Sequence, residues 1–233
     1  MKHGKRYNKA SELLEKNKTY SLSEAVELVK KTATAKFDET IDISVKLGVD
    51  PKHADQMVRS TVVLPYGTGK SIKVAVIAKG EKEKDAKDAG ADLVGSAEII
   101  EEIQKGNINF DVLITTPDMM RDLSKLGKIL GPKGLMPNPK AGTVTFEVAQ
   151  AVRDAKRGKV EFRVDDGGVI HLGIGKKSFR AQNLLENLNM FFETVFKVKP
   201  SSAKGQYLLG AHLSASMGPD IPLNVNEIMN TYR

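Results

Sequence analysis

The chain has 233 residues, of which 40% are hydrophobic, and it contains no cysteine. This length allows one large domain or two modest ones with a substantial core. The absence of cysteine excludes disulfides, thiolate nucleophiles and thiolate metal sites, and we expect a reducing, cytoplasmic setting. The net charge of +7 favours a polyanionic partner. The most apolar core stretch is far too short to span a bilayer, so we expect no membrane segment.

The N-terminal part predicts a capped helix followed by two strands. Ser21 and Glu24 form a capping-box pattern at the start of a helical apolar face. Apolar and polar residues then alternate over residues 40–49, which is typical of a strand with one buried and one wet face. A second strand follows and ends at Pro65. We therefore expect an antiparallel sheet with an open polar face.

From about residue 70 the pattern changes to short apolar runs that alternate with helices. The runs cover residues 72–78, 91–95 and 110–116, and the last is followed by a predicted helix over 117–130. Buried strands separated by helices indicate parallel βαβ units, covered by helices on both faces. This predicts a small Rossmann-like α/β domain.

The alternating pattern returns after a predicted helix over 146–158. Two strand-like runs flank the turn at residues 165–168, and we expect them to form a β-hairpin. A long amphipathic helix over 180–198 and a last strand over 206–216 complete the chain. Because this part must pair with the first strands, the predicted fold is an α+β split domain that carries the inserted α/β domain.

The predicted boundaries of these two domains follow from that change of pattern. The discontinuous α+β domain comprises residues 1–67 and 160–233, and the inserted α/β domain comprises residues 68–159. Glycine-containing linkers near 66–70 and 157–160 favour relative motion of the two domains.

A loop rich in proline, glycine and lysine, KILGPKGLMPNPKAGTV, occupies residues 128–144. Its composition opposes helix and strand, so we expect its backbone amides to remain available to a partner. Residues 123–146 contain four lysines and no acid, which indicates that this partner is anionic. For any single lysine, a solvated position remains the better interpretation.

The motifs that would indicate an enzyme are absent or incomplete. PYGTGKS at 65–71 has Leu64 where a phosphate-binding loop needs glycine, and a strand rather than a helix follows it. GIGKKS at 173–178 lacks the third glycine of a dinucleotide fingerprint. The histidines show no metal-ligand spacing and no nucleophile elbow exists. We expect no catalytic residue, metal or cofactor.

Two short stretches favour contact with RNA. Phe37 stands between Lys36 and Asp38, where an aromatic ring could stack on a base while the lysine meets phosphate. The alternative is that Phe37 closes the end of the core. At 214–222, small residues and Met217 offer a close backbone approach and an adaptable apolar contact, although a plain turn explains them equally.

GPKGLMPNPK, with AKFDET before it and SMGP after it, resembles the bacterial form of the ribosomal protein L-one family over essentially the whole chain. The resemblance implies a structural ribosomal protein of the large subunit, on the mobile stalk beside the tRNA exit site. Its implied partners are large-subunit ribosomal RNA, the exit-site tRNA that it helps to release, and the mRNA of its own operon, whose translation it represses. It also implies a monomer when free.

The resemblance further implies which residues bind RNA. The principal site would use Glu27, Lys36, Phe37, Thr40, His171, Lys176, Ser178, Ser216, Met217 and Gly218. A secondary contact would use Gly131, Lys133, Gly134 and Lys140. The family has a serine a few residues before the SMG turn where this chain has Gly210, so the resemblance does not carry over one side-chain hydrogen bond at this position.

Two other functions stay open at the level of sequence. The parallel-sheet pattern of residues 70–159 permits an α/β enzyme or a nucleotide-binding module. A protein-interaction adaptor is the third possibility. Binding of a nucleotide would indicate the enzyme or nucleotide-binding module. Partner binding that is insensitive to ribonuclease would indicate the adaptor.

Overall fold

The computed structural model of the chain describes residues 4–15 and 18–232. The contacts divide the chain into two compact units. The first unit combines Met1–Gly69 with Val160–Arg233, and the second comprises Lys70–Lys159. Within the described ranges, no helix is long and apolar enough to cross a membrane.

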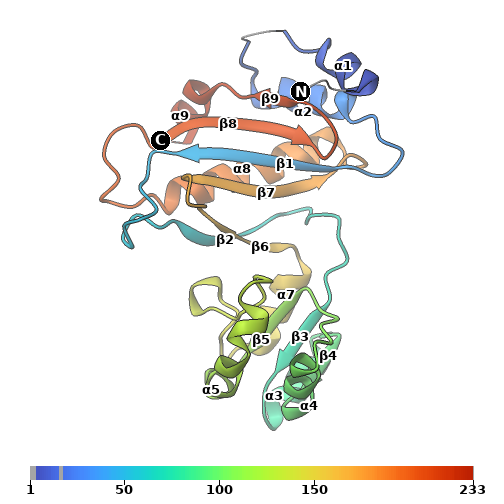
Figure 1. Cartoon of the computed structure of the whole chain (residues 1–233), viewed down its shortest axis with the longest axis vertical. Coiled ribbons are helices and arrows are strands. Elements are labelled where there is room, and N and C mark those ends of the chain that lie inside the picture. Colours follow the sequence, from blue (N-terminus) through green and yellow to red (C-terminus); the bar gives the residue numbers. More distant parts are fainter. Residues whose placement is uncertain (1–3, 16–17, 233) are drawn as a thin grey trace. The chain divides into compact units, whose positions relative to one another are not determined.

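A four-stranded antiparallel sheet organises the first unit, in the order β7-β1-β8-β9 (Figure 1). Its strands are β1 (Thr40–Leu47), β7 (Val169–Lys176), β8 (Leu208–Ala215) and β9 (Asp220–Pro222). The central strand β1 pairs with both neighbours, so that Ile43 lies opposite Leu172 and Leu213. Buried and more accessible residues alternate along β1. The predicted antiparallel sheet with one polar face is confirmed.

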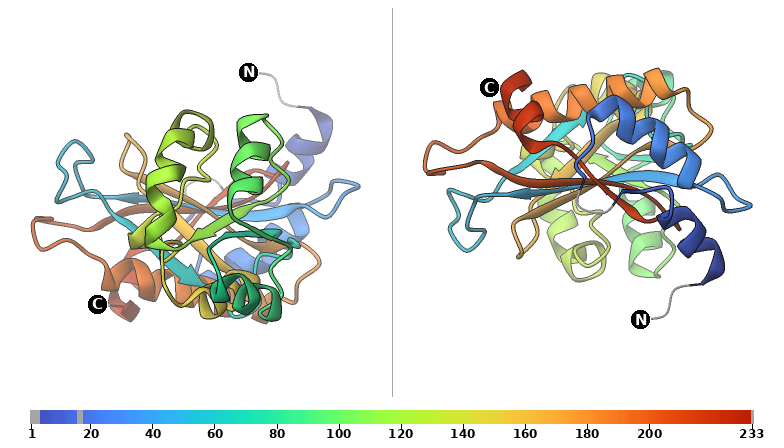
Figure 2. Two further views of the ribbon diagram at one scale, coloured as in Figure 1. Left: turned by 90° about the horizontal axis from the view of Figure 1, so that it is seen from below. Right: turned by 90° about the horizontal axis from the view of Figure 1, so that it is seen from above.

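Helices cover one face of this sheet. They are α2 (Leu22–Thr32), α8 (Ala181–Lys197) and α9 (Val225–Tyr232), which lie behind the sheet in Figure 1 and on one side of it in Figure 2. The predicted capping box is present, because Ser21 Oγ accepts the Glu24 N–H and the Glu24 carboxylate accepts the Ser21 N–H. These three helices leave the near face of the sheet in Figure 1 open.

The core of the first unit lies between the sheet and these helices. Phe162 and Phe191 are fully buried there, and their ring centroids lie 5.7 Å apart in an edge arrangement. Phe192 lies 5.5 Å from Phe191. These large side chains supply much of the apolar area that holds the N-terminal and C-terminal segments in one unit. A short helix, α1 (Lys5–Ser11), packs against α2.

The prediction of a β-hairpin around residues 165–168 is correct for the turn but wrong for the two strands, which belong to different sheets. β6 (Lys159–Arg163) pairs with β2 (Arg59–Val63) in a separate two-stranded sheet, whereas β7 pairs with β1. A single bridge between Val164 and Ile170 joins the two strands next to the turn. Alternation predicts a strand and its buried face, but it does not choose between two available partners.

A three-stranded parallel sheet, in the order β4-β3-β5, organises the second unit. The strands are β3 (Val74–Ile77), β4 (Leu93–Gly95) and β5 (Val112–Thr115), and the main helices are α3 (Glu81–Asp88), α4 (Ala97–Gln104) and α7 (Val148–Lys156). Ala75 and Ile77 pack in one hydrophobic cluster, while Val74 and Val76 pack in another. Both faces of the sheet are therefore covered, as the continuous apolar runs predict.

The single helix predicted over 117–130 is instead a series of short turns. They are η1 (Pro117–Met119), α5 (Met120–Leu123), η2 (Ser124–Leu126) and α6 (Gly127–Leu130). Ser124 Oγ donates to the Met120 carbonyl at 2.8 Å, and Gly127 follows in the next turn. A back-bonding serine and a glycine both weaken a regular helix, which accounts for the 3₁₀ segments. A further 3₁₀ turn, η3 (Pro139–Ala141), lies in the loop that follows.

Candidate nucleic-acid interface

Three segments that are far apart in the sequence meet at the start of β1. Thr40 lies opposite Lys176 on β7, and the next residue, Ile41, lies opposite Ala215 on β8. The central position of β1 therefore places residues 35–40 beside both residues 176–178 and residues 216–218. Eight of the predicted principal-site residues lie on these segments.

Hydrogen bonds tie these segments together. Lys176 Nζ donates to Thr40 Oγ1 at 2.8 Å, and the Ser216 N–H donates to the Thr40 carbonyl at 3.0 Å. Ser178 donates its N–H and its hydroxyl to the Asp38 carboxylate, at 3.0 and 2.8 Å. The polar groups of Thr40, Ser178 and Ser216 thus form hydrogen bonds within the protein that hold the segments together. The Lys176 ammonium has three N–H donors and uses one of them here, so the others can bind an acceptor on a partner.

Phe37 and Met217 are the two apolar side chains that this arrangement leaves open. Phe37 is 56% exposed and Met217 is 53% exposed. Phe37 therefore does not close the end of the core. Lys36 beside it is also exposed. An aromatic ring, a methionine and a lysine on one fixed surface can stack on bases and meet phosphate.

Glu39 and Asp38 were not predicted as parts of this surface, yet both hold it together. Glu39 is fully buried, and its carboxylate accepts the N–H groups of Ala35 and Met217. The sequence carries a signal for Glu39, because it continues the buried phase of Ile41 and Ile43 on the strand. A buried carboxylate needs hydrogen-bond donors. A glutamate at an inward strand position therefore indicates that neighbouring segments supply these donors.

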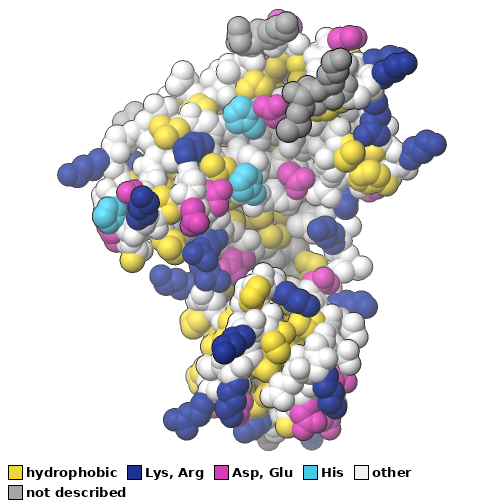
Figure 3. All heavy atoms as spheres, in the orientation of Figure 1, with side chains coloured by type: hydrophobic (Ala, Val, Ile, Leu, Met, Phe, Trp, Pro, Cys, Tyr) yellow, Lys and Arg dark blue, Asp and Glu magenta, His cyan; other side chains and the backbone are white. Residues whose placement is uncertain are grey.

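His171 lies on the uncovered face of the sheet, away from the start of β1 where the three segments meet. It pairs in register with Ser44, and the distance from Ser44 Oγ to His171 Nδ1 is 3.0 Å. Four residues of strand separate Ser44 from Thr40, which corresponds to about 13 Å. Figure 3 shows histidine and side chains of both charges on this face.

Asp165 stands at the end of the same face, in the turn that precedes β7. Its Oδ2 lies 3.5 Å from His171 Nε2. The Val169 N–H, with a second hydrogen bond from the Gly167 N–H, holds the pKa of the Asp165 carboxyl below its ordinary value of 3.8. Hydrogen bonds to the ionised form cause this shift, so the turn is most stable when Asp165 is charged.

Gly218, Gly210 and Glu27 lie at different positions relative to the three segments that meet at the start of β1. Gly218 packs tightly, because a Cβ there would come within 3.3 Å of Ala215 Cβ. Gly210 lies opposite Lys46 on the uncovered face, with room for a side chain. The Glu27 side chain is exposed on α2 and, within residues 4–15 and 18–232, it makes no hydrogen bond or ion pair. Its part in the site therefore stays a prediction.

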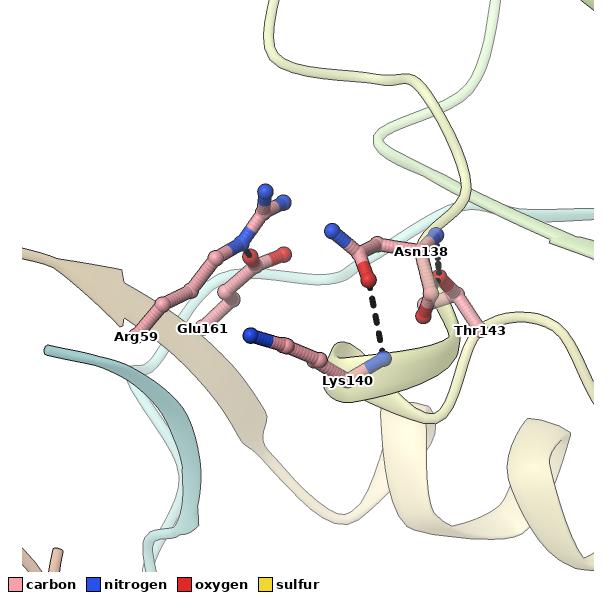
Figure 4. Close-up of polar contacts among 5 residues, drawn as sticks. All are labelled: Arg59, Asn138, Lys140, Thr143 and Glu161. Carbon is pink, nitrogen blue, oxygen red and sulfur yellow. Dashed lines mark hydrogen bonds and ion pairs between the residues drawn. The ribbon is translucent and has the colours of Figure 1, made fainter. Parts of the chain in front are cut away.

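The proline-rich loop of the second unit uses many of its own amides, which corrects the expectation that they remain free. The Asn138 side chain accepts the Lys140 N–H at 2.8 Å, and Thr143 Oγ1 accepts the Asn138 N–H at 2.8 Å (Figure 4). The Leu135 N–H donates to the Leu130 carbonyl. Turns and side-chain acceptors replace helix and strand as hydrogen-bond partners here.

Two glycines determine the backbone path of this loop, and two lysines supply its exposed charge. A Cβ on Gly131 would come within 2.6 Å of the Gly127 carbonyl oxygen, and Gly134 adopts a positive φ of 70°. Both positions therefore require glycine. Lys133 and Lys140 are exposed. The loop is a rigid edge that offers lysine charge rather than free amides.

Arg59 and Glu161, drawn in Figure 4, form an ion pair across β2 and β6 of the first unit. Both side chains are about one-third accessible or less. This pair neutralises an arginine outside the converging segments, so it adds little to the positive field available for RNA.

The ribosomal protein L1p/L10e family matches this chain over residues 29–219. The matched range contains the three converging segments, His171 and the proline-rich loop. It does not include Glu27.

Proposed function

Because the chain belongs to the ribosomal protein L1p/L10e family, we propose that its first unit holds the principal RNA site at the three converging segments. The family consists of structural ribosomal proteins, so this chain is a ribosomal protein that binds ribosomal RNA of the large subunit, and it is not an enzyme. The Phe37–Met217 surface is the name we give to the site formed by Lys36, Phe37, Thr40, Lys176, Ser178, Ser216, Met217 and Gly218.

The observation that carries this proposal is the joint exposure of Phe37 and Met217 on hydrogen-bonded segments. Exposed apolar side chains on mobile loops would lose conformational entropy on binding, whereas side chains on fixed segments lose less. Phe37 would stack on a base or ribose, and Lys36 and Lys176 would contact phosphates. His171 would extend the contact along the uncovered face, and Glu27 would contribute from α2.

We assign a weaker contact to the proline-rich loop of the second unit, through Gly131, Lys133, Gly134 and Lys140. Residues 128–144 contain no aromatic side chain, so the loop should add affinity through phosphates without reading bases. In this proposal the discontinuous domain of residues 1–67 and 160–233 recognises the RNA, and residues 68–159 add to its affinity.

The finer role that we propose is that of a stalk protein of the bacterial type. It would bind the mobile stalk of the large subunit, assist release of deacylated tRNA from the exit site, and repress translation of its own operon by binding a similar mRNA site. It would act in the cytoplasm and be a monomer when free. The resemblance of GPKGLMPNPK, AKFDET and SMGP to the bacterial family form supports this role.

Alanine substitution at the two exposed apolar residues tests the RNA site. We expect Phe37→Ala and Met217→Ala each to weaken binding of a stalk fragment of ribosomal RNA by about 1 to 3 kcal/mol, because each removes a contact to a base or ribose. The measurement is a filter-binding titration at several salt concentrations, with log affinity falling as salt rises.

Matched controls exist for both variants. Phe146 in the second unit is also 56% exposed, and Met190 on α8 is 38% exposed, so Phe146→Ala and Met190→Ala should leave the affinity unchanged. Equal losses of affinity in the control variants would contradict a localised site. Salt-independent binding would count against RNA phosphate contacts altogether.

Two simple measurements on the same protein test the two other function classes. Micromolar binding of ATP, GTP or NAD in calorimetry would support a nucleotide-binding module in the second unit. Partner binding that survives ribonuclease treatment would support a protein-interaction adaptor. Our proposal predicts neither result.

A further inference from the structure

A buried glutamate joins all three segments of the Phe37–Met217 surface. Glu39 is 0% exposed, and its Oε1 accepts the Ala35 N–H at 2.6 Å while its Oε2 accepts the Met217 N–H at 3.0 Å. Its backbone carbonyl accepts the Lys177 N–H at 2.9 Å. One residue therefore contacts the loop before β1, the end of β7 and the turn after β8.

The alternating pattern of the strand would accept an apolar residue at this position. Ile41, Ile43 and Val45 continue the same buried phase. A buried carboxylate is costly unless it is hydrogen-bonded, and the two backbone N–H groups meet that requirement. An apolar residue would instead leave the amides of Ala35 and Met217 without this acceptor, which carries its own cost.

These two bonds act at the two exposed apolar side chains of the surface. Phe37 lies inside the short loop that the bond from Ala35 to Glu39 closes, and the second bond holds the backbone of Met217 itself. The Asp38 carboxylate, which binds Ser178, supports the loop from its other side. Glu39 thus links the backbone of Met217 directly to the loop that carries Phe37.

We propose that Glu39 is a positioning residue for RNA binding, which preorganises Phe37 and Met217 without touching the RNA. This inference rests on the proposed function of the Phe37–Met217 surface. Preorganisation increases affinity because the segments are already ordered before the RNA arrives. A positioning role also explains why a buried carboxylate lies beneath the centre of a surface that binds RNA.

A Glu39→Gln variant separates positioning from simple electrostatics. Glutamine has nearly the same shape, but its amide group cannot accept one of the two backbone N–H groups. Removal of a negative charge beside RNA would by itself tighten binding. Positioning predicts the opposite, namely an increase in Kd for the stalk RNA fragment on the order of tenfold, which corresponds to the loss of one hydrogen bond to a charged group.

A double-mutant cycle with Met217→Ala distinguishes positioning from loss of stability. If Glu39 acts through Met217, Glu39→Gln should have much less effect on Kd when Met217 is already alanine, because residues that act through one another are not additive. A full effect in the Met217→Ala background would overturn the proposal. So would an unchanged or lower Kd for Glu39→Gln alone.

Asn187 provides a control for buried polar groups of the same unit. It is also 0% exposed, and its side chain accepts the Tyr66 N–H and donates to the Ile174 carbonyl, away from the surface. Asn187→Asp should lower the stability of the first unit and leave Kd within about twofold. A similar rise in Kd for both variants would assign the effect of Glu39 to stability and overturn the inference.

The remaining outcomes are also decisive. If Glu39→Gln prevents folding, we expect the same increase in Kd from Glu39→Asp, because the aspartate side chain is one methylene shorter and its carboxylate cannot reach both amides. If Phe37→Ala and Met217→Ala both leave Kd unchanged, the proposed site is wrong and the role of Glu39 fails with it. If these two variants weaken binding but neither variant of Glu39 does, the positioning role alone is wrong.

Discussion

The Phe37–Met217 surface of the first unit and the proline-rich loop of the second unit are built in different ways. The surface is assembled from three segments that β1 brings together, and buried Glu39 fixes two of them. The loop is continuous in sequence and is closed by bonds within itself, such as that from the Lys140 N–H to Asn138. Long-range assembly can place an aromatic ring and a methionine at a set spacing, which suits recognition. Local closure gives a rigid charged edge, which suits phosphate contact.

The largest expected effect comes from the core that holds the surface together. Phe191→Ala should lower the free energy of unfolding of the first unit by about 3 to 5 kcal/mol, because a fully buried ring is removed. RNA affinity should fall with it at denaturant concentrations where the unit begins to unfold. Tyrosine fluorescence during urea unfolding reports the first unit alone, because all five tyrosines lie there.

The matching change in the second unit sharpens this comparison. Leu130 is fully buried at the start of the proline-rich loop, and Leu130→Ala should cost about 2 to 5 kcal/mol in that unit. Tyrosine fluorescence should then change little while circular dichroism records the unfolding. If Leu130→Ala removed specific RNA binding as strongly as Phe191→Ala, the assignment of recognition to the first unit would be wrong.

A smaller effect is expected from the charged edge. In the double variant Lys133→Ala and Lys140→Ala, the slope of log affinity against log salt should become shallower by about 0.7 to 0.9 for each phosphate that the loop no longer neutralises. Preference for the stalk fragment over an unrelated RNA should not change, because phosphate contacts carry no sequence information.

Two exposed lysines of α3 serve as the control for this slope. Lys84→Ala with Lys87→Ala removes the same charge from the same unit without touching the loop. An equal change of slope in both double variants would show that only the total charge matters. A change of preference in the loop variant would show that the loop reads RNA sequence.

The smallest expected effect is a change in unfolding temperature when the side-chain acceptor is removed from one turn of each unit. Asp165 and Asn138 each accept backbone N–H groups with a side-chain oxygen, but only Asp165 titrates. Asp165→Ala should lower the unfolding temperature at neutral pH. The folded-state pKa of Asp165 is depressed, so its contribution is present above 3.8 and is lost as the pH falls through the lower native pKa.

Thermal unfolding measured across acidic pH tests this difference. The gap between the wild-type protein and Asp165→Ala should close below pH 3.8, whereas the gap caused by Asn138→Ala should stay constant. A gap for Asp165→Ala that persisted at the lowest pH would mean that the charge of the carboxylate does not stabilise the turn.

Several features of this protein could be predicted from the sequence because they depend on neighbouring residues. The capping box at Ser21, the alternation along β1 and the covered parallel strands of the second unit all follow from local periodicity. The fold class is confirmed for the same reason. Short elements such as α1, β9 and α9 were not predicted, because so few residues give little periodic signal.

The candidate site was predictable only in part. Phe37 and Met217 could be identified as unusual, but their exposure could not, since a core position for Phe37 fitted the same pattern. The amides of the proline-rich loop were expected to be free, yet Asn138 and Thr143 satisfy several of them. Side-chain acceptors within a turn are visible only when the backbone path is known.

The sequence by itself determined the capped helix at Ser21, the alternation along β1, the parallel strands of the second unit and the charged loop, because each is encoded within a short stretch of chain. Only the tertiary structure decided that β6 pairs with β2 and that Glu39 accepts the Met217 N–H. Those contacts connect residues that are far apart along the chain, and the pattern of one strand does not specify which distant segment supplies its partner.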